Sequence, residues 1–209
     1  MPTLEELCNK HGTNKVWHGY TSFYEKLFEP IRSNPVNFLE IGIDQGGSLL
    51  AWQDYFSNGT IYGIDIVIPN RIANQSTIKY AITDQSSPQQ LLQTLESWNN
   101  PKFNVIIDDG SHWVSHQRIS METLWKSVAP GGYYVIEDLH TNIRALHYIH
   151  PHMNEHCRHI DETPTNHDRI NRIMAGSTNE FGIPVSEISE IYYFNTPNRL
   201  SLSCAFKKA

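Results

Sequence analysis

The sequence predicts an α/β fold with a doubly wound, mainly parallel sheet, and two features of its apolar pattern lead to this prediction. Short apolar runs alternate with longer stretches in which apolar residues recur every three or four positions, as in strands separated by amphipathic helices. Strands joined by helices of this length form βαβ units, whose parallel sheet is covered on both faces. Because the 209 residues contain no internal repeat or low-complexity linker, we expect a single domain.

The first two thirds of the chain carry the repeating part of this pattern. Residues 1–35 are expected to form a helical segment, whose polar stretch HGTNKVWHGY could fold over a ligand as a lid. The apolar runs that predict strands lie at 37–43, 60–66, 78–82, 103–107 and 132–136. The amphipathic runs that predict helices lie at 46–56, 89–98 and 115–128. Pro130, Gly131 and Gly132 are expected to stop the last of these helices.

The last third follows a different pattern. Apolar runs at 190–194 and 200–206 flank the turn-forming sequence NTPNR, so we expect an antiparallel hairpin to join the sheet. Residues 139–180, within a domain that spans 36–209, lack strand character and are rich in histidine. We interpret this segment as an insertion that faces the substrate rather than as a second metal site, because the spacings are irregular and no cysteine pairs with the histidines. These histidines are His140, His147, His150, His152, His156, His159 and His167.

Charge and composition exclude several classes of function. The net charge of −6 comes from scattered acids and bases, which argues against a nucleic-acid binder with a concentrated basic face. The three cysteines are far apart, so neither a disulfide framework nor a zinc ribbon is expected. The amino terminus has early acids and no apolar run, and no apolar stretch approaches membrane-spanning length. The expected protein is therefore cytoplasmic and does not bind membranes.

A glycine-rich turn and two acidic strand ends predict a nucleoside site. In open α/β sheets, ligands bind outside the carboxyl ends of the strands. The first such end, LEIGIDQGGS, contains Gly42 and Gly46, which would let the backbone turn sharply and approach a ligand. It is neither a G-x-G-x-x-G motif nor a P-loop. Asp65 follows 23 residues after Gly42 and could accept both ribose hydroxyls, while Asp84 could face an adenine edge. The alternatives are a tight strand-to-helix turn and ordinary helix caps.

With these motifs the chain resembles the class I S-adenosylmethionine-dependent methyltransferases. Within that superfamily the segments HGTNK, FLEIGIDQGGS, IDDGSH and VIEDLHT resemble the metal-dependent sugar O-methyltransferases of macrolide biosynthesis, of the mycinamicin type. The resemblance covers nearly the whole chain and implies a Rossmann-like fold with S-adenosylmethionine as cofactor. It assigns cofactor binding to residues at the strand ends, together with Tyr20 before the first strand. The assigned residues are Glu40, Gly42, Gly46, Ser48, Asp65, Asp84, Gln85, Asp108 and Tyr20.

Three acids after the fourth and fifth predicted strands are expected to bind a divalent cation. Neighbouring parallel strands lie roughly 5 Å apart, so Asp109, Glu137 and Asp138 should converge. Carboxylates so close would repel one another unless a cation lay between them. All-oxygen ligation favours Mg²⁺, with Mn²⁺ or Ca²⁺ as alternatives. The separations of 28 and 29 residues from Asp109 match the ligand pattern of the metal-dependent O-methyltransferases. The alternative interpretation is two solvated strand ends.

His112 is the candidate general base. It lies three residues after Asp109, and an imidazole can deprotonate a hydroxyl that a cation has already acidified. The macrolide enzymes that the sequence resembles use the histidine of this motif as a base; the alternative is a histidine that caps the following helix. His116 is expected to support the site, and Asp108 to face the cofactor or the core. Tyr20 and His18 are weaker candidates near the cofactor.

The expected function is therefore methyl transfer from S-adenosylmethionine to a hydroxyl group of a small molecule. The resemblance implies that the acceptor is a sugar or a polyol-like natural product. Two alternatives remain open: a metal-independent methyltransferase that acts on a carboxylate or a nitrogen, and a non-catalytic nucleoside-binding protein. The tryptophans and tyrosines of the amino-terminal segment could support a homo-oligomer surface.

Overall fold

The computed structural model describes residues 1–138, 183, 185–196 and 201–209. Seven strands within these ranges form one sheet in the order β3-β2-β1-β4-β5-β7-β6. The first five strands are parallel to one another, and β7 is antiparallel to both β5 and β6. The strands are β1 (Asn37–Ile41), β2 (Thr60–Asp65), β3 (Ile78–Ile82), β4 (Phe103–Asp108), β5 (Val128–Ile136), β6 (Ile188–Thr196) and β7 (Ser201–Lys208). The predicted fold class and carboxyl-terminal hairpin are confirmed.

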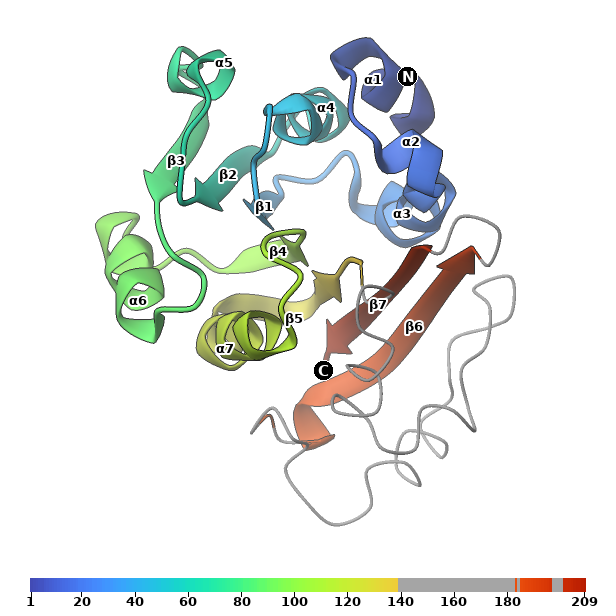
Figure 1. Cartoon of the computed structure of the whole chain (residues 1–209). Coiled ribbons are helices and arrows are strands. Elements are labelled where there is room, and N and C mark those ends of the chain that lie inside the picture. Colours follow the sequence, from blue (N-terminus) through green and yellow to red (C-terminus); the bar gives the residue numbers. More distant parts are fainter. Residues whose placement is uncertain (139–182, 184, 197–200) are drawn as a thin grey trace.

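Helices cover both faces of the sheet (Figure 1). One face packs against α6 and α7, and the other packs against α1, α3 and α4. The helices are α1 (Leu4–His11), α2 (Lys15–His18), α3 (Tyr20–Phe28), α4 (Gly47–Tyr55), α5 (Asn70–Ala73), α6 (Pro88–Ser97) and α7 (Val114–Leu124). Short 3-10 turns lie at η1 (Glu29–Ile31), η2 (Trp125–Ser127) and η5 (Val185–Glu187).

The central strands owe their near-continuous apolar sequences to this double covering. On β1, Phe38 packs into the core beneath α4, whereas its neighbour Leu39 packs into the core beneath α6 and α7. Successive side chains of a strand point to opposite faces, so a strand covered on both sides carries apolar residues at consecutive positions. On β4, Val105 and Ile106 divide between the two cores in the same way.

The prediction that Pro130, Gly131 and Gly132 stop a helix is wrong. Helix α7 ends at Leu124, and the three residues lie inside β5. The register between β4 and β5 shifts there, from Phe103 opposite Val128 to Val105 opposite Tyr133. A strand can accommodate extra residues in such an irregularity, and proline and glycine are common where a strand ladder is interrupted.

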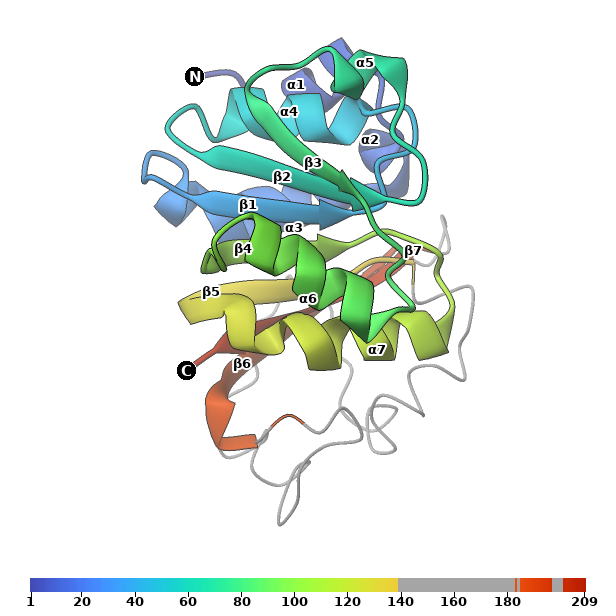
Figure 2. The same ribbon diagram turned by 90° about the vertical axis from the view of Figure 1, so that its left-hand side faces the viewer.

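The amino-terminal helices precede β1 and pack beside α4 (Figures 1 and 2). Helix α1 begins with a capping box in which the Thr3 side chain accepts from the Glu6 amide and Glu6 accepts from the Thr3 amide. It ends at Gly12, which has a φ of 71°. In the described part of the chain, no helix is long and apolar enough to cross a membrane. The histidine-rich segment and the NTPNR turn fall outside the described residues, apart from Asn195 and Thr196 at the end of β6.

Candidate methyl-transfer site

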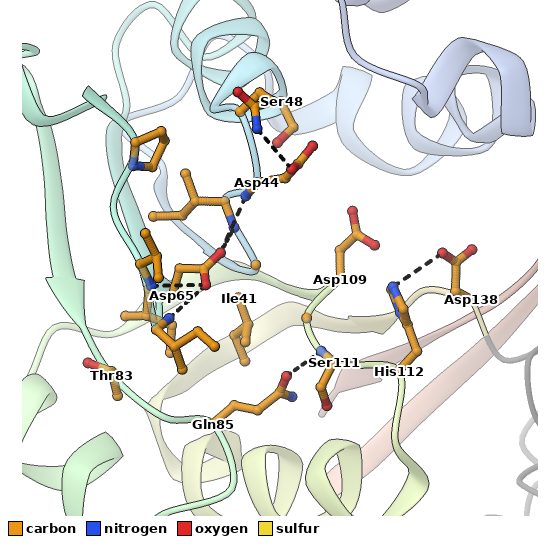
Figure 3. Close-up of a pocket in the computed structure, with 18 of the residues that line it drawn as sticks. Ile41, Asp44, Ser48, Asp65, Thr83, Gln85, Asp109, Ser111, His112 and Asp138 are labelled. Carbon is orange, nitrogen blue, oxygen red and sulfur yellow. Dashed lines mark hydrogen bonds and ion pairs between the residues drawn. The ribbon is translucent and has the colours of Figure 1, made fainter. Parts of the chain in front are cut away.

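A pocket of about 1070 Å³ opens at the carboxyl ends of β1, β2, β3 and β4 (Figure 3). Its wall includes the strand ends, the start of α4 and the turn between α1 and α2. Five predicted cofactor residues line it, namely Gly42, Ser48, Asp65, Asp84 and Gln85. Glu40, Gly46, Asp108 and Tyr20 are not among the lining residues. The pocket therefore lies at the strand ends where the sequence predicts a nucleoside site. Only some of the residues that the sequence assigns to the cofactor line it.

Packing within the protein requires the two glycines of the first turn, one of which, Gly42, also lines the pocket. Gly42 has a φ of 93°, and a Cβ atom there would lie 2.1 Å from the carbonyl oxygen of Asp109. Gly46 has a φ of 80°, and its Cβ would lie 2.4 Å from Cγ1 of Ile72 in α5. Both glycines also need a left-handed backbone that other residues rarely adopt. The turn after β1 is thus fitted directly against the loop that follows β4.

Asp65 lines the pocket and holds the neighbouring backbone in place. Its Oδ2 accepts a hydrogen bond of 2.6 Å from the Ile43 amide, and its Oδ1 accepts one of 2.6 Å from the Ile66 amide. The carboxylate therefore joins the end of β2 to the turn after β1, and it lines the pocket in the place expected for a ribose partner. Next to it, the side chains of Ile66 and Val67 line the pocket and remain more than 60% exposed.

Asp84 and Asp108 have different environments. Asp84 lines the pocket, and hydrogen bonds from the hydroxyl and amide of Ser86 lower its pKa. Asp108 is fully buried, which raises its pKa, and it accepts hydrogen bonds from Gln85 and Ser120. The other end of the Gln85 amide accepts a hydrogen bond of 2.7 Å from the Ser111 amide. Of the two orientations expected for Asp108, toward the cofactor or toward the core, the structure has the second. From there Asp108 positions the pocket residue Gln85.

Three side chains at the ends of β4 and β5 form a group with the chemistry of a metal site. Asp109, His112 and Asp138 each offer one ligand atom, and these atoms all lie within 4.8 Å of one another. His112 Nε2 lies 3.7 Å from Oδ2 of Asp138. Figure 3 shows these two side chains facing one another. His112 and Asp138 have φ values of 58° and 55°. Left-handed backbone at residues other than glycine costs roughly 1–3 kcal/mol and is concentrated at functional sites.

Glu137 does not belong to this group, although the sequence places it among the metal ligands. Its Oε1 accepts hydrogen bonds from Tyr24 and from Nζ of Lys15, the latter at 2.7 Å. Lys15 Nζ also lies 2.9 Å from Oδ2 of Asp109 and 3.2 Å from Oε1 of Glu40. Burial raises the pKa of Glu137 to about 8, with a further contribution from Asp109. Burial alone would lower the pKa of Lys15, but its three carboxylate partners raise it above its usual value.

Lys15 is the site residue that the sequence reasoning missed. It lies in the polar HGTNK stretch, and a single lysine gives no indication of partners at strand ends that are 25 or more residues away. The weaker candidate Tyr20 contacts the candidate metal group. Its hydroxyl donates a hydrogen bond of 2.7 Å to Oδ1 of Asp138, so it braces a candidate metal ligand. His116 lines the pocket, with its Nδ1 2.9 Å from the Ser111 hydroxyl.

Comparison with known proteins places this arrangement among methyltransferases. No protein-family model matches the chain. The chain is 36% identical over 151 residues to the 8-demethyl-8-alpha-L-rhamnosyl tetracenomycin-C 2'-O-methyltransferase of Streptomyces olivaceus, which covers 68% of this chain and 39% of that protein. It is 39% identical over 150 residues to the demethylmacrocin O-methyltransferase of Streptomyces fradiae, which covers 67% of this chain and 37% of that protein. The chain thus spans well under half the length of these curated relatives.

A solved structure gives the same result. MycE, a methyltransferase from the mycinamycin biosynthetic pathway solved in complex with Mg, SAH and mycinamycin VI, superposes with a TM-score of 0.76. The two sequences are 25% identical, and the match covers 100% of this chain and 55% of MycE. The chain therefore has the Rossmann-like class I methyltransferase fold and is a relative of the sugar O-methyltransferases of macrolide and polyketide biosynthesis, as its glycine turn and its IDDGSH and VIEDLHT segments predict.

Proposed function

We propose that this chain carries out S-adenosylmethionine-dependent, Mg²⁺-dependent methylation of a hydroxyl group on a sugar or polyol-like natural product. The observation that carries the proposal is the placement of the Asp109–His112–Asp138 group, because all three residues also line the strand-end pocket. A pocket for the methyl donor and a group suited to a divalent cation therefore share one wall. The relatives' named activities support the same reaction class.

In this proposal the cofactor lies across the carboxyl ends of the first three strands. Asp65 is placed to accept hydrogen bonds from ribose hydroxyls, and Asp84 to face the adenine edge. Ile66 and Val67 offer exposed apolar side chains for the adenine ring to cover. When bound there, S-adenosylmethionine would supply an electrophilic methyl group, and S-adenosylhomocysteine would be the second product.

Asp109 and Asp138 are the carboxylates that would hold the cation. Hard divalent cations such as Mg²⁺ prefer oxygen ligands and keep several coordination positions for water or substrate, which suits a site with two protein carboxylates; Mn²⁺ and Ca²⁺ are chemically similar alternatives. A cation held by these carboxylates would lower the pKa of an acceptor hydroxyl and would offset the negative charge on its oxygen. Tyr20 keeps the Asp138 carboxylate in place through its hydroxyl. Glu137, which the resemblance also assigns to the metal, instead balances the charge of Lys15.

His112 is proposed as the general base. Its Nε2 faces Asp138, and its Nδ1 is buried without a hydrogen-bond partner among the residues that the structure describes. Nε2 would accept the proton of the acceptor hydroxyl as the oxygen–methyl bond forms and the sulfur–methyl bond breaks. The same nitrogen is close enough to act as a third ligand, so metal affinity and turnover must both be measured in a variant at this position.

The test is methyl transfer from labelled S-adenosylmethionine in the presence of Mg²⁺. Glycosylated polyketides with free sugar hydroxyls are the acceptors, and matched compounds whose polar groups are only carboxylates or amines are the controls. We expect label on a sugar oxygen, located by NMR of the product. Transfer confined to carboxylates or amines would favour the metal-independent alternative. Cofactor binding without transfer to any acceptor would favour a nucleoside-binding protein.

A further inference from the structure

The Lys15 ammonium group forms ion pairs with three carboxylates next to the proposed metal site. Its side chain is 2% exposed, and its Nζ lies 2.7 Å from Glu137, 2.9 Å from Asp109 and 3.2 Å from Glu40. A buried ammonium group is unfavourable unless carboxylates surround it, and here each of its three partners comes from a different strand end. Asp109 is the partner that also belongs to the candidate metal group. One oxygen of Asp109 is therefore held by the protein's own cation.

The same lysine begins the helix that follows a pocket-lining turn. Gly12, Thr13 and Asn14 line the pocket, and α2 starts at Lys15. The turn packs tightly on the start of α4, where a Cβ atom at Gly47 would lie 2.9 Å from the carbonyl oxygen of His11. Its backbone is held by a hydrogen bond of 3.1 Å that the Thr13 amide donates to the carbonyl oxygen of Cys8. The Lys15 side chain connects this wall of the pocket to the end of β4, 94 residues further along the chain.

We propose that Lys15 is a positioning residue of this site, whose ammonium group fixes the Asp109 carboxylate and anchors the turn Gly12–Asn14 against the cofactor pocket. This inference rests on the proposed function. A cation bound to Asp109 restricts that carboxylate, which in turn restricts Lys15 and the turn. The cofactor, by contacting the turn, restricts the same elements from the other side. Binding of one ligand therefore favours binding of the other, and the effect is reciprocal.

The experiment measures binding of S-adenosylhomocysteine by calorimetry, with and without saturating Mn²⁺, in the wild type and in Lys15→Met. Methionine keeps an unbranched apolar side chain of similar length and removes the charge. In the wild type we expect each ligand to tighten the other by about fivefold or more. In Lys15→Met we expect metal-free cofactor affinity to fall by about tenfold and the mutual tightening to fall to less than about twofold.

The matched control is Arg32→Met. Arg32 is also a buried cation that holds the amino-terminal segment, because its Nη2 donates a hydrogen bond of 2.6 Å to the carbonyl oxygen of Pro2 and its guanidinium stacks on Tyr55. It does not line the pocket. A general weakening of the amino-terminal packing should appear in both variants as a lower melting temperature. Loss of cofactor affinity and of mutual tightening should appear only in Lys15→Met.

A second variant covers the case in which Lys15→Met does not fold because two buried carboxylates and the half-buried Asp109 lose their cation. Lys15→Met/Glu40→Gln removes one of these charges and keeps an amide that can accept the Ser48 hydroxyl. The inference is overturned if a folded Lys15 variant keeps either wild-type cofactor affinity or wild-type mutual tightening, or if Arg32→Met loses both to the same extent. A wild-type protein that binds neither S-adenosylhomocysteine nor Mn²⁺ would instead contradict the proposed function.

Discussion

Glu137 and Asp138 are adjacent acids with different surroundings, so exchanging each for its amide separates metal ligation from internal charge balance. Asp138→Asn removes a charge from the group that includes Asp109 and His112, while an amide oxygen can still accept from Tyr20. Above the raised pKa of Glu137, which is about 8, Glu137→Gln removes a charge that is paired with Lys15, and its amide oxygen can still accept from Lys15 and Tyr24. The two substitutions are equal in size and in charge, so each serves as the control for the other.

The expected magnitudes follow from these contacts. Removing a charged partner costs about 1.5–3 kcal/mol on the scale of hydrogen bonds to charged groups, and each 1.4 kcal/mol corresponds to a factor of ten in affinity. Asp138→Asn should therefore weaken Mn²⁺ binding by roughly 10- to 150-fold. Glu137→Gln should change Mn²⁺ affinity by less than about threefold but lower the free energy of unfolding by about 1–3 kcal/mol, because a buried ammonium group loses a charged partner.

Water-proton relaxation during Mn²⁺ titration measures the affinities, and thermal unfolding followed by circular dichroism measures stability. The assignment of ligands would be refuted if Glu137→Gln weakened Mn²⁺ binding as much as Asp138→Asn or more. That outcome would restore the ligand set that the spacing of acids in the sequence implies, with Glu137 in contact with the metal and Lys15 displaced from it.

Three further predictions concern the base, the glycine turn and a buried thiol. His112→Ala should lower turnover by about 10²- to 10⁴-fold and change Mn²⁺ affinity by less than about fivefold; a metal affinity that falls as far as turnover would make His112 a ligand instead. Gly42→Ala should lower both the melting temperature and S-adenosylhomocysteine affinity, because the added Cβ would meet the Asp109 carbonyl. The control is Gly131→Ala: Gly131 also has a positive φ, of 71°, but its Cβ would point into open space, so this variant should keep wild-type affinity. Burial raises the pKa of the Cys8 thiol to about 12. In a variant whose other two cysteines are serine, this thiol should therefore resist Ellman's reagent at pH 8 in the folded protein and react on unfolding. Rapid reaction of the folded protein would show that α1 does not shield the thiol.

The sheet could be predicted from the sequence because its strands are buried on both faces. A run such as NFLEI has adjacent apolar residues that point to opposite faces, and the helices between such runs have their own three- and four-residue spacing. The acids at the strand ends could be predicted for the same reason, since a polar residue after a buried strand marks where the chain leaves the core. Asp65 and Asp109 were found in this way, and both line the pocket.

The details that the sequence did not predict depend on partners that are distant along the chain. The Pro-Gly-Gly sequence has the composition of a helix stop, and only its register opposite Phe103 and Val105 makes it an irregularity within β5. Glu137 and Asp138 are equivalent as residues in a motif, and the difference between them arises because Lys15 and Tyr24 occupy the surroundings of one of them. Pairings across more than one hundred residues leave no local pattern in either segment.

The dependence of methyl transfer on a divalent cation tests the central claim most directly. Turnover of labelled S-adenosylmethionine with a glycosylated acceptor should be measured before chelation, after rigorous treatment with EDTA, and after Mg²⁺ is restored. The arrangement of Asp109, His112 and Asp138 predicts that chelation abolishes transfer and that Mg²⁺ restores it. Transfer that continues unchanged in the chelated protein would contradict the account.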